Sequence, residues 1–286
     1  MIFKPFSRRR WNSRSDCTRW WPGLLGLMLL LASEARADVL IMTHGYVSGD
    51  DAWVSSGVTA ALARGGWEAG GRVRADGRGI VVTPAATGGG RKVYYLADLA
   101  SEAPLSVQAD QLREVAREVV KRRDRQEQMV LVGHSAGGVV ARLAMAKDDK
   151  LGVFGLITIA SPHLGTDKAE VAGLVASTPL SMVAPMMGVG TLNRSRQLYA
   201  DLARERPGNL LHWLNRQPHP KARYHSLVRR ESFPLMGDNT VPVWSQDLRK
   251  VEALREVAGS ETVGSGHGLE SEDGVALARI LAEWLP

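Results

Sequence analysis

The sequence contains little that points to metal binding, disulfide bonding or nucleic-acid binding. Its only cysteine, Cys17, lies near the N-terminus, so the rest of the 286-residue chain has no disulfide and no cysteine-ligated metal site. The net charge of +6 comes almost entirely from residues 1–37, which carry seven basic and two acidic residues. Residues 38–286 carry 29 basic and 28 acidic residues without a basic block, which argues against a nucleic-acid partner.

The apolar run at residues 24–32 is too short for a membrane-spanning helix. About nine residues make about 14 Å of helix, half of a hydrocarbon core of roughly 30 Å. Basic residues precede the run, and Ala35 and Ala37 after it suit signal peptidase. We therefore expect a signal peptide over 1–37, cleaved after Ala37, and an exported protein, periplasmic or secreted. A membrane anchor made by an uncleaved leader is the alternative.

Strands and helices alternate through residues 38–286, which we expect to form a single domain. The central strands are apolar on both faces, which is typical of an α/β fold with a mostly parallel sheet covered by helices on both sides. We expect about six strands in this sheet, with a hairpin as an extra element. The expected strands cover 38–46, 70–84 (the hairpin), 91–99, 128–133, 152–161, 222–230 and 260–264, and the expected helices cover 52–65, 106–122, 138–147 and 273–285. Ligands bind such sheets beyond the carboxyl ends of the strands, so residues that follow strands are the candidates for a site.

One strand end carries a G-x-S-x-G motif. Its residues are Gly133, His134, Ser135, Ala136 and Gly137, and they lie between an apolar strand and a predicted helix. A sharp turn at this place exposes the serine hydroxyl, and the flanking glycines remove side chains that would collide with the backbone. We predict that Ser135 is a nucleophile. The alternative is an ordinary serine in a glycine-rich turn.

A serine nucleophile needs a base and an acid that orients the base, here in the chain order serine, acid, histidine. Asp238 follows the strand at 222–230 in a turn-forming context. Its alternative role is a turn aspartate that bonds its own backbone. Asp247 and Asp273 are rivals, but neither follows a strand. We therefore predict Asp238 as the acid.

The histidine is expected on a flexible loop after the last strand. His267 lies in such a loop between two glycines, which let the imidazole reach inward. Its alternative is an exposed loop histidine. His44 and His163 follow other strands and are interpreted as structural. Three further histidines precede Asp238 and break the chain order: His212, His219 and His225.

Two backbone N–H groups are expected to form an oxyanion hole. One belongs to Ala136, directly after the nucleophile. The other is expected in the loop after the first strand, where His44 and Gly45 precede Tyr46. Gly45 allows close approach of the backbone, so the N–H of Tyr46 is the predicted second donor.

Together these motifs resemble the α/β-hydrolase superfamily, and within it the bacterial lipase and esterase branch. The matching segments are THGY (43–46), GHSAGG (133–138), SPHLGT (161–166), GDNTVP (237–242) and GHG (266–268). The resemblance implies a catalytic triad of Ser135, Asp238 and His267, with Tyr46 and Ala136 as oxyanion donors. It also implies a serine carboxylic-ester hydrolase that works through an acyl-enzyme intermediate.

The segment at about 167–220 is interpreted as a lid or cap inserted over the site. Its part at 171–190 is apolar and rich in methionine, which is typical of a lid that binds an acyl chain and contacts lipid surfaces transiently. A buried helical pair is the alternative. Residues 195–217 are expected to form one or two amphipathic helices. We expect an acylglycerol or similar lipid ester as substrate, while acyltransferases, thioesterases and lipid-anchor deacylases use the same triad.

No cofactor is expected, because this chemistry needs none. No pair of histidines has zinc-ligand spacing on one predicted element, although a structural calcium ion stays compatible with the sequence.

Overall fold

The computed structural model describes Met1 and residues 38–46, 48–76, 79–86, 89–123, 127–167, 195–230 and 240–285. Its contacts divide the chain into two compact units, Met1–Ala35 and Arg36–Pro286. All helices and strands given below belong to the second unit. Apart from Met1, the expected signal peptide lies outside the described residues, so cleavage after Ala37 stays a prediction.

The second unit is built on one mostly parallel sheet of eight strands. The strands are β1 (Asp38–Thr43), β2 (Glu68–Asp76), β3 (Gly79–Pro84), β4 (Lys92–Asp98), β5 (Gln128–His134), β6 (Val153–Ile159), β7 (Arg223–Val228) and β8 (Ala258–Thr262). Their order is β3-β2-β4-β1-β5-β6-β7-β8, and only the pair β2–β3 is antiparallel. The expected parallel α/β sheet is therefore confirmed.

The sheet has eight strands rather than about six because the hairpin joins it. β2 pairs in parallel with β4, so the hairpin extends the sheet at one edge. Val73 and Ala75 of β2 are buried, whereas the arginines between and before them are exposed. This alternation is typical of a strand with one covered face, but it does not identify the neighbouring strand.

Helices lie in most of the connections between the strands, and one more follows the last strand. They are α2 (Asp51–Ser55), α3 (Val58–Arg64), α4 (Leu105–Arg122), α5 (Ala136–Lys147), α9 (Arg196–Asp201), α10 (Leu210–Leu214), α11 (Val243–Gln246) and α12 (Ser271–Trp284), with 3₁₀ turns η1 (Asp149–Leu151), η3 (Leu248–Lys250) and η4 (Glu252–Leu254). The single helix expected over 52–65 is wrong. Gly57 adopts a left-handed φ of 82°, which separates α2 from α3.

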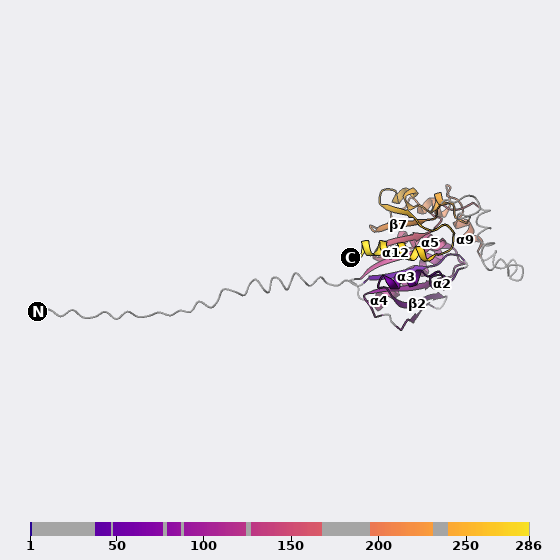
Figure 1. Ribbon diagram of the computed structural model, residues 1–286. Helices are drawn as coiled ribbons and strands as arrows, with labels where there is room; N and C mark the ends of the chain where they lie inside the picture. Colours follow the sequence, from indigo (N-terminus) through magenta and orange to yellow (C-terminus); the bar gives the residue numbers. More distant parts are fainter. Residues whose placement is uncertain are drawn as a thin grey trace. The chain divides into compact units, whose positions relative to one another are not determined.

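The core lies on both faces of the sheet. In β1, Val39 and Ile41 pack into one cluster with residues of α4 and α5, while Leu40 and Met42 pack into a second with residues of α3 and α12. Helices α3 and α12 contact each other on the face of the sheet that carries Leu40 and Met42. Helices α4 and α5 contact each other on the opposite face. Figure 1 shows α12, in yellow, along the sheet beside α3.

Parallel strands place their carboxyl ends at one edge of the sheet, and the loops that follow them meet there. The candidate residues after β1, β5 and β8 belong to these loops. Within the described part of the chain, we find no helix with the length and apolar character that crossing a membrane requires.

Candidate active site

Ser135 occupies the turn between β5 and α5. Its backbone has a φ of 53° and a ψ of −129°, a conformation that non-glycine residues rarely adopt. Its N–H donates to the carbonyl of Ile159 at 2.9 Å, which fixes the turn against β6. A Cβ on Gly133 would lie 2.4 Å from the Cα of Gly138, so strand and helix approach too closely for a side chain. The chain thus holds the serine in a strained, tightly packed turn.

His267 lies in the loop after β8, and its Nε2 is 2.9 Å from the Oγ of Ser135. This distance is within the range in which an imidazole accepts a proton from a hydroxyl. The two residues are 132 positions apart in the sequence. The structure therefore brings together two of the three side chains that the sequence predicted as a triad.

The residue before the serine holds the histidine loop. Nε2 of His134 is 2.8 Å from the carbonyl oxygen of His267, and this contact makes the His134 ring the donor because a carbonyl only accepts. The two imidazole rings are also stacked at an angle, with centroids 5.3 Å apart. In the sequence, His134 is only the variable residue of the G-x-S-x-G motif. The motif accepts any residue at this position, so it gave no signal for this contact.

The loop after β1 touches the serine directly. A Cβ on Gly45 would lie 2.8 Å from the Cβ of Ser135, and a Cβ on Gly137 would lie 2.5 Å from the carbonyl oxygen of His44. The backbone of this loop therefore packs against both the serine and the first turn of α5, where Ala136 begins the helix. Two backbone N–H groups can face the same reacting oxygen only if the segments that carry them lie close together. The segments of the predicted donors, Tyr46 and Ala136, meet this condition.

The side chain of Tyr46 points to other partners. Its hydroxyl donates to the Oγ of Ser195 at 3.0 Å and lies 2.7 Å from the hydroxyl of Tyr199 in α9. Tyr46 and Ser195 are buried. This cluster ties the loop after β1 to the helix that follows the segment 168–194.

A charged cluster holds the same loop on the side of the hairpin. Nε2 of His44 lies 3.6 Å from Oδ1 of Asp98 at the end of β4, and Nε of Arg74 in β2 donates to Oδ2 of Asp98 at 2.8 Å. The contacts with His44 first and Arg74 second outweigh the opposing effect of burial and lower the pKa of Asp98 to about 2. The hairpin at the sheet edge thereby contacts the loop beside the serine through Asp98.

The predicted acid, Asp238, lies outside the described residues. Its two rivals are both engaged by arginines. Asp247 accepts from Nη2 of Arg249 at 2.8 Å. Asp273 forms a buried ion pair with Arg229 through two hydrogen bonds. A carboxylate held in this way is poorly available to orient an imidazole.

The other histidines have partners away from the serine. His163 is fully buried with Nε2 3.0 Å from Oγ1 of Thr158, and burial holds its pKa well below the usual range. Burial lowers the pKa of His219 to about 4. Both rings are therefore neutral at pH 7. The interpretation of His163 as a structural histidine fits this environment.

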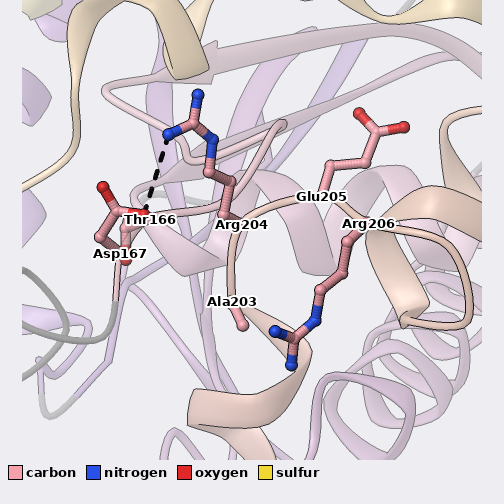
Figure 2. Close-up of a pocket in the computed structure, with 6 residues that line it drawn as sticks. All are labelled: Thr166, Asp167, Ala203, Arg204, Glu205 and Arg206. Carbon is pink, nitrogen blue, oxygen red and sulfur yellow. Dashed lines mark ion pairs between the residues drawn. The ribbon is translucent and has the colours of Figure 1, made fainter.

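A pocket of about 280 Å³ opens beside the loop that follows β6. Its lining consists of Thr166, Asp167, Ala203, Arg204, Glu205 and Arg206, and Figure 2 shows Arg204 reaching toward Asp167. The Arg204–Asp167 ion pair is long, at 3.9 Å, and the guanidinium stacks 4.7 Å above the ring of Trp244. Backbone bonds of 2.9 Å tie Thr166 to Leu202 and Arg204, so this loop and the C-terminal part of the insertion pack together.

The predicted lid is only partly described. Residues 168–194, with the methionine-rich stretch, lie outside the described part. The two short helices α9 and α10 confirm the expectation of helices over 195–217. Leu198 of α9, Leu202 directly after it, and Leu211 and Leu214 of α10 are buried in the core. In the described ranges, no group of three or more potential ligands from histidine, cysteine, aspartate or glutamate could hold a metal ion.

The sheet order, the strained serine turn and the histidine loop define an α/β-hydrolase. The chain belongs to the family described as "Putative serine esterase (DUF676)", whose profile matches residues 101–245. It is therefore a hydrolase that acts on esters. The matched region includes Ser135 and ends before His267. No curated protein matches the chain in sequence.

Several solved structures share the fold. The Pyrococcus furiosus esterase PF2001 aligns over 88% of this chain and 84% of its own, with a TM-score of 0.54 and 13% identity. The mature form of the Bacillus licheniformis lipase BlEst2 aligns over 88% and 92%, with a TM-score of 0.50 and 14% identity. The lin2722 product of Listeria innocua aligns over 80% and 85%, with a TM-score of 0.54 and 14% identity. At these identities the likeness concerns the fold alone.

Proposed function

We propose that the protein is an exported serine hydrolase that cleaves carboxylic esters, with lipid or acylglycerol esters as its substrates. The observation that carries the proposal is the 2.9 Å contact between Nε2 of His267 and Oγ of Ser135 at a strained strand-to-helix turn. A serine hydroxyl is a weak nucleophile unless an adjacent base takes its proton. The contact supports His267 as that base.

In the proposed reaction, His267 takes the Ser135 proton while Oγ attacks the ester carbonyl. The negative oxygen of the tetrahedral intermediate accepts hydrogen bonds from the N–H groups of Ala136 and Tyr46. His267 then protonates the leaving alcohol, which leaves an acyl-enzyme on Ser135. A water molecule, deprotonated by His267, releases the acid and restores the serine. Removing one oxyanion donor typically costs on the order of 3 kcal/mol of transition-state stabilisation.

Asp238 is the proposed acid that orients His267. The chain order favours it, and the arginine partners of Asp247 and Asp273 argue against both rivals. Val228, the last residue of β7, precedes Asp238 in the chain, so Asp238 belongs to the segment after a strand end, where this chemistry needs it.

Export rests on the leader at residues 1–37. Strand β1 begins at Asp38, so a cut after Ala37 would remove no residue of the sheet. The mass of the mature protein recovered outside the cytoplasm tests this part of the proposal. A mature chain that still contains residues before Asp38 would contradict the expected cleavage site.

The decisive experiment is hydrolysis of nitrophenyl esters from acetate to palmitate by the wild type and by Ser135→Ala. We expect turnover that rises toward long acyl chains, and a loss on the order of 10³-fold or more in kcat in the variant. Labelling by a fluorophosphonate should disappear in the same variant. Activity on short chains only would count against lipid esters and favour a general esterase. Unchanged activity in Ser135→Ala would overturn the mechanism.

A further inference from the structure

A buried ion pair lies beside the histidine loop. Arg229 directly follows β7 and Asp273 lies in the first turn of α12, and both side chains are fully buried. Nη1 of Arg229 donates to Oδ1 of Asp273 at 2.5 Å, and Nη2 donates to Oδ2 at 3.0 Å. This bidentate geometry fixes the plane and the direction of the guanidinium.

The same guanidinium holds the loop that carries the base. Nη1 donates to the carbonyl of Val263 at 3.0 Å, and Nη2 donates to the carbonyl of Gly268 at 2.7 Å. Val263 precedes His267 by four positions, and Gly268 directly follows it. The N–H of Arg230 also donates to the carbonyl of Gly264 at 2.9 Å. The loop is thus fixed at both ends by the strand end of β7.

Asp273 adds a second set of contacts to the loop. Its Oδ2 accepts from the N–H of Glu270 at 2.8 Å, as part of the capping box of α12. Oε1 of Glu270 in turn accepts from the N–H of Gly266 at 3.3 Å. The carboxylate therefore aligns the guanidinium and the start of α12 together. The side-chain hydrogen bonds of Arg229 and Asp273 go to each other and to the backbone of residues 263, 268 and 270.

Arg229 also lies at the base of the segment that contains Asp238. Its N–H donates to Oε1 of Gln246 at 2.8 Å, and Nε2 of Gln246 donates to the carbonyl of Val241 at 2.7 Å. Residues 229 and 241 flank the segment 231–239. The backbone of Arg229 thus contacts Gln246 beside the proposed acid segment, while its side chain contacts the loop of the proposed base.

We propose that Arg229, aligned by Asp273, is a positioning residue that sets His267 within proton-transfer distance of Ser135. This inference rests on the proposed function. A buried ion pair is often replaceable by apolar residues without loss of stability, so stability alone does not explain this one. Its bonds to the carbonyls of Val263 and Gly268 give it a different task, which is to place the loop.

The test compares Arg229→Met with Arg142→Met. Arg142 in α5 is a matched control, since it is equally buried but its guanidinium donates to Asn215 at 2.6 Å and to the carbonyl of His163 at 3.5 Å, not to the histidine loop. Kinetics with nitrophenyl butyrate are measured where circular dichroism shows each protein folded. We expect kcat to fall about 100-fold in Arg229→Met with KM within about twofold. A shift of the His267 imidazole by about 1 Å is enough for a loss of this size. The control should stay within about threefold of the wild type.

Arg229→Lys provides a graded second variant. Its ammonium can meet Asp273 and one carbonyl but lacks the fork that spans two, so we expect a loss of about tenfold in kcat. The rate of fluorophosphonate labelling of Ser135 should fall in the same order. A kcat in Arg229→Met equal to that of Arg142→Met, or a change confined to KM, would overturn the inference.

Failure of the proposed function gives a different result. In that case the wild type itself is not labelled, or Ser135→Ala keeps its activity. If Arg229→Met does not fold, Arg229→Lys and Asp273→Asn are measured in the same way. If none of the three folds while Arg142→Met does, the pair serves the fold itself, and the positioning role is overturned.

Discussion

At residue 46 the backbone and the side chain have separate tasks. The N–H is the proposed oxyanion donor, while the hydroxyl bonds Ser195 and Tyr199. Tyr46→Phe keeps the backbone, so we expect kcat for ester hydrolysis to remain within about twofold. The lost hydroxyl leaves the buried Ser195 with one partner fewer, which should lower the free energy of unfolding by about 1 kcal/mol. Urea denaturation and nitrophenyl ester kinetics measure the two effects separately.

Tyr199→Phe serves as the comparison, because it removes the other hydroxyl of the cluster without touching the loop after β1. Both variants should show a similar loss of stability. A fall in kcat in Tyr46→Phe of more than tenfold, absent from Tyr199→Phe, would show that the side chain and not only the backbone serves the reaction.

Asp98 makes stability depend on pH in the acid range. Its pKa is lowered from 3.8 to about 2 in the folded state, so the unfolded chain binds a proton first as the pH falls. The stabilisation from its contacts with His44 and Arg74 is therefore complete above pH 3.8 and is lost as the pH falls toward 2. In urea titrations, the difference between wild type and Asp98→Asn should be constant near neutrality and shrink over this interval. A difference that persists unchanged down to pH 2 would contradict this assignment.

At the scale of elements, helix α12 depends on a close approach to α3. A Cβ on Gly274 would lie 2.8 Å from the Cα of Val58 and 2.7 Å from the Cβ of Ala61. Alanine is normally better than glycine inside a helix by about 1 kcal/mol. Here we expect Gly274→Ala to destabilise, because overpacking costs about 1–3 kcal/mol and the backbone of α3 has no flexible end to move. The melting temperature measures the result.

Val275→Ala is the control for this prediction. Val275 is 59% exposed on the same helix, so its truncation should change the free energy of unfolding by less than about 0.5 kcal/mol. A Gly274→Ala protein as stable as the wild type would mean that α3 and α12 separate without loss.

Local sequence patterns predicted most elements but not all of their boundaries or neighbours. The strand at 128–133 and the helix after it were recognisable because an apolar run ends there at a glycine-rich turn and a helical pattern follows at once. The break at Gly57 was not, since a single glycine inside an apolar helical pattern also occurs within unbroken helices. The place of the hairpin beside β4 depends on a pairing between distant segments, which neither segment shows alone.

The candidate site was predictable to the extent that chain order and motif context fix it. Ser135 and His267 were found in this way, and the structure places them in contact. The contacts of His134 and Arg229 were not predictable, since no motif fixes their roles and their partners lie 133 and 44 residues away in the sequence. Asp238 remains a prediction from chain order.

For the whole molecule, we expect residues 38–286 to fold and act without the leader. The unit Arg36–Pro286 contains every described helix and strand, and the N–H of Asp38 already bonds the carbonyl of Arg91 at 2.7 Å. A protein beginning at Asp38 should therefore match the melting temperature and kcat of the processed enzyme. Circular dichroism and ester hydrolysis test this. Aggregation or loss of activity on removal of the leader would contradict it.

Residue 45 has to be a glycine, and this requirement offers one route by which such an enzyme can lose its activity during evolution. Because a Cβ there would lie 2.8 Å from the Cβ of Ser135, one added methyl group would displace the loop or the serine. Descendants could become inactive while the genes still encode every reacting side chain. Among relatives of this protein, an intact serine and histidine would then fail to distinguish a working esterase from a pseudoenzyme, and position 45 would be the place to look.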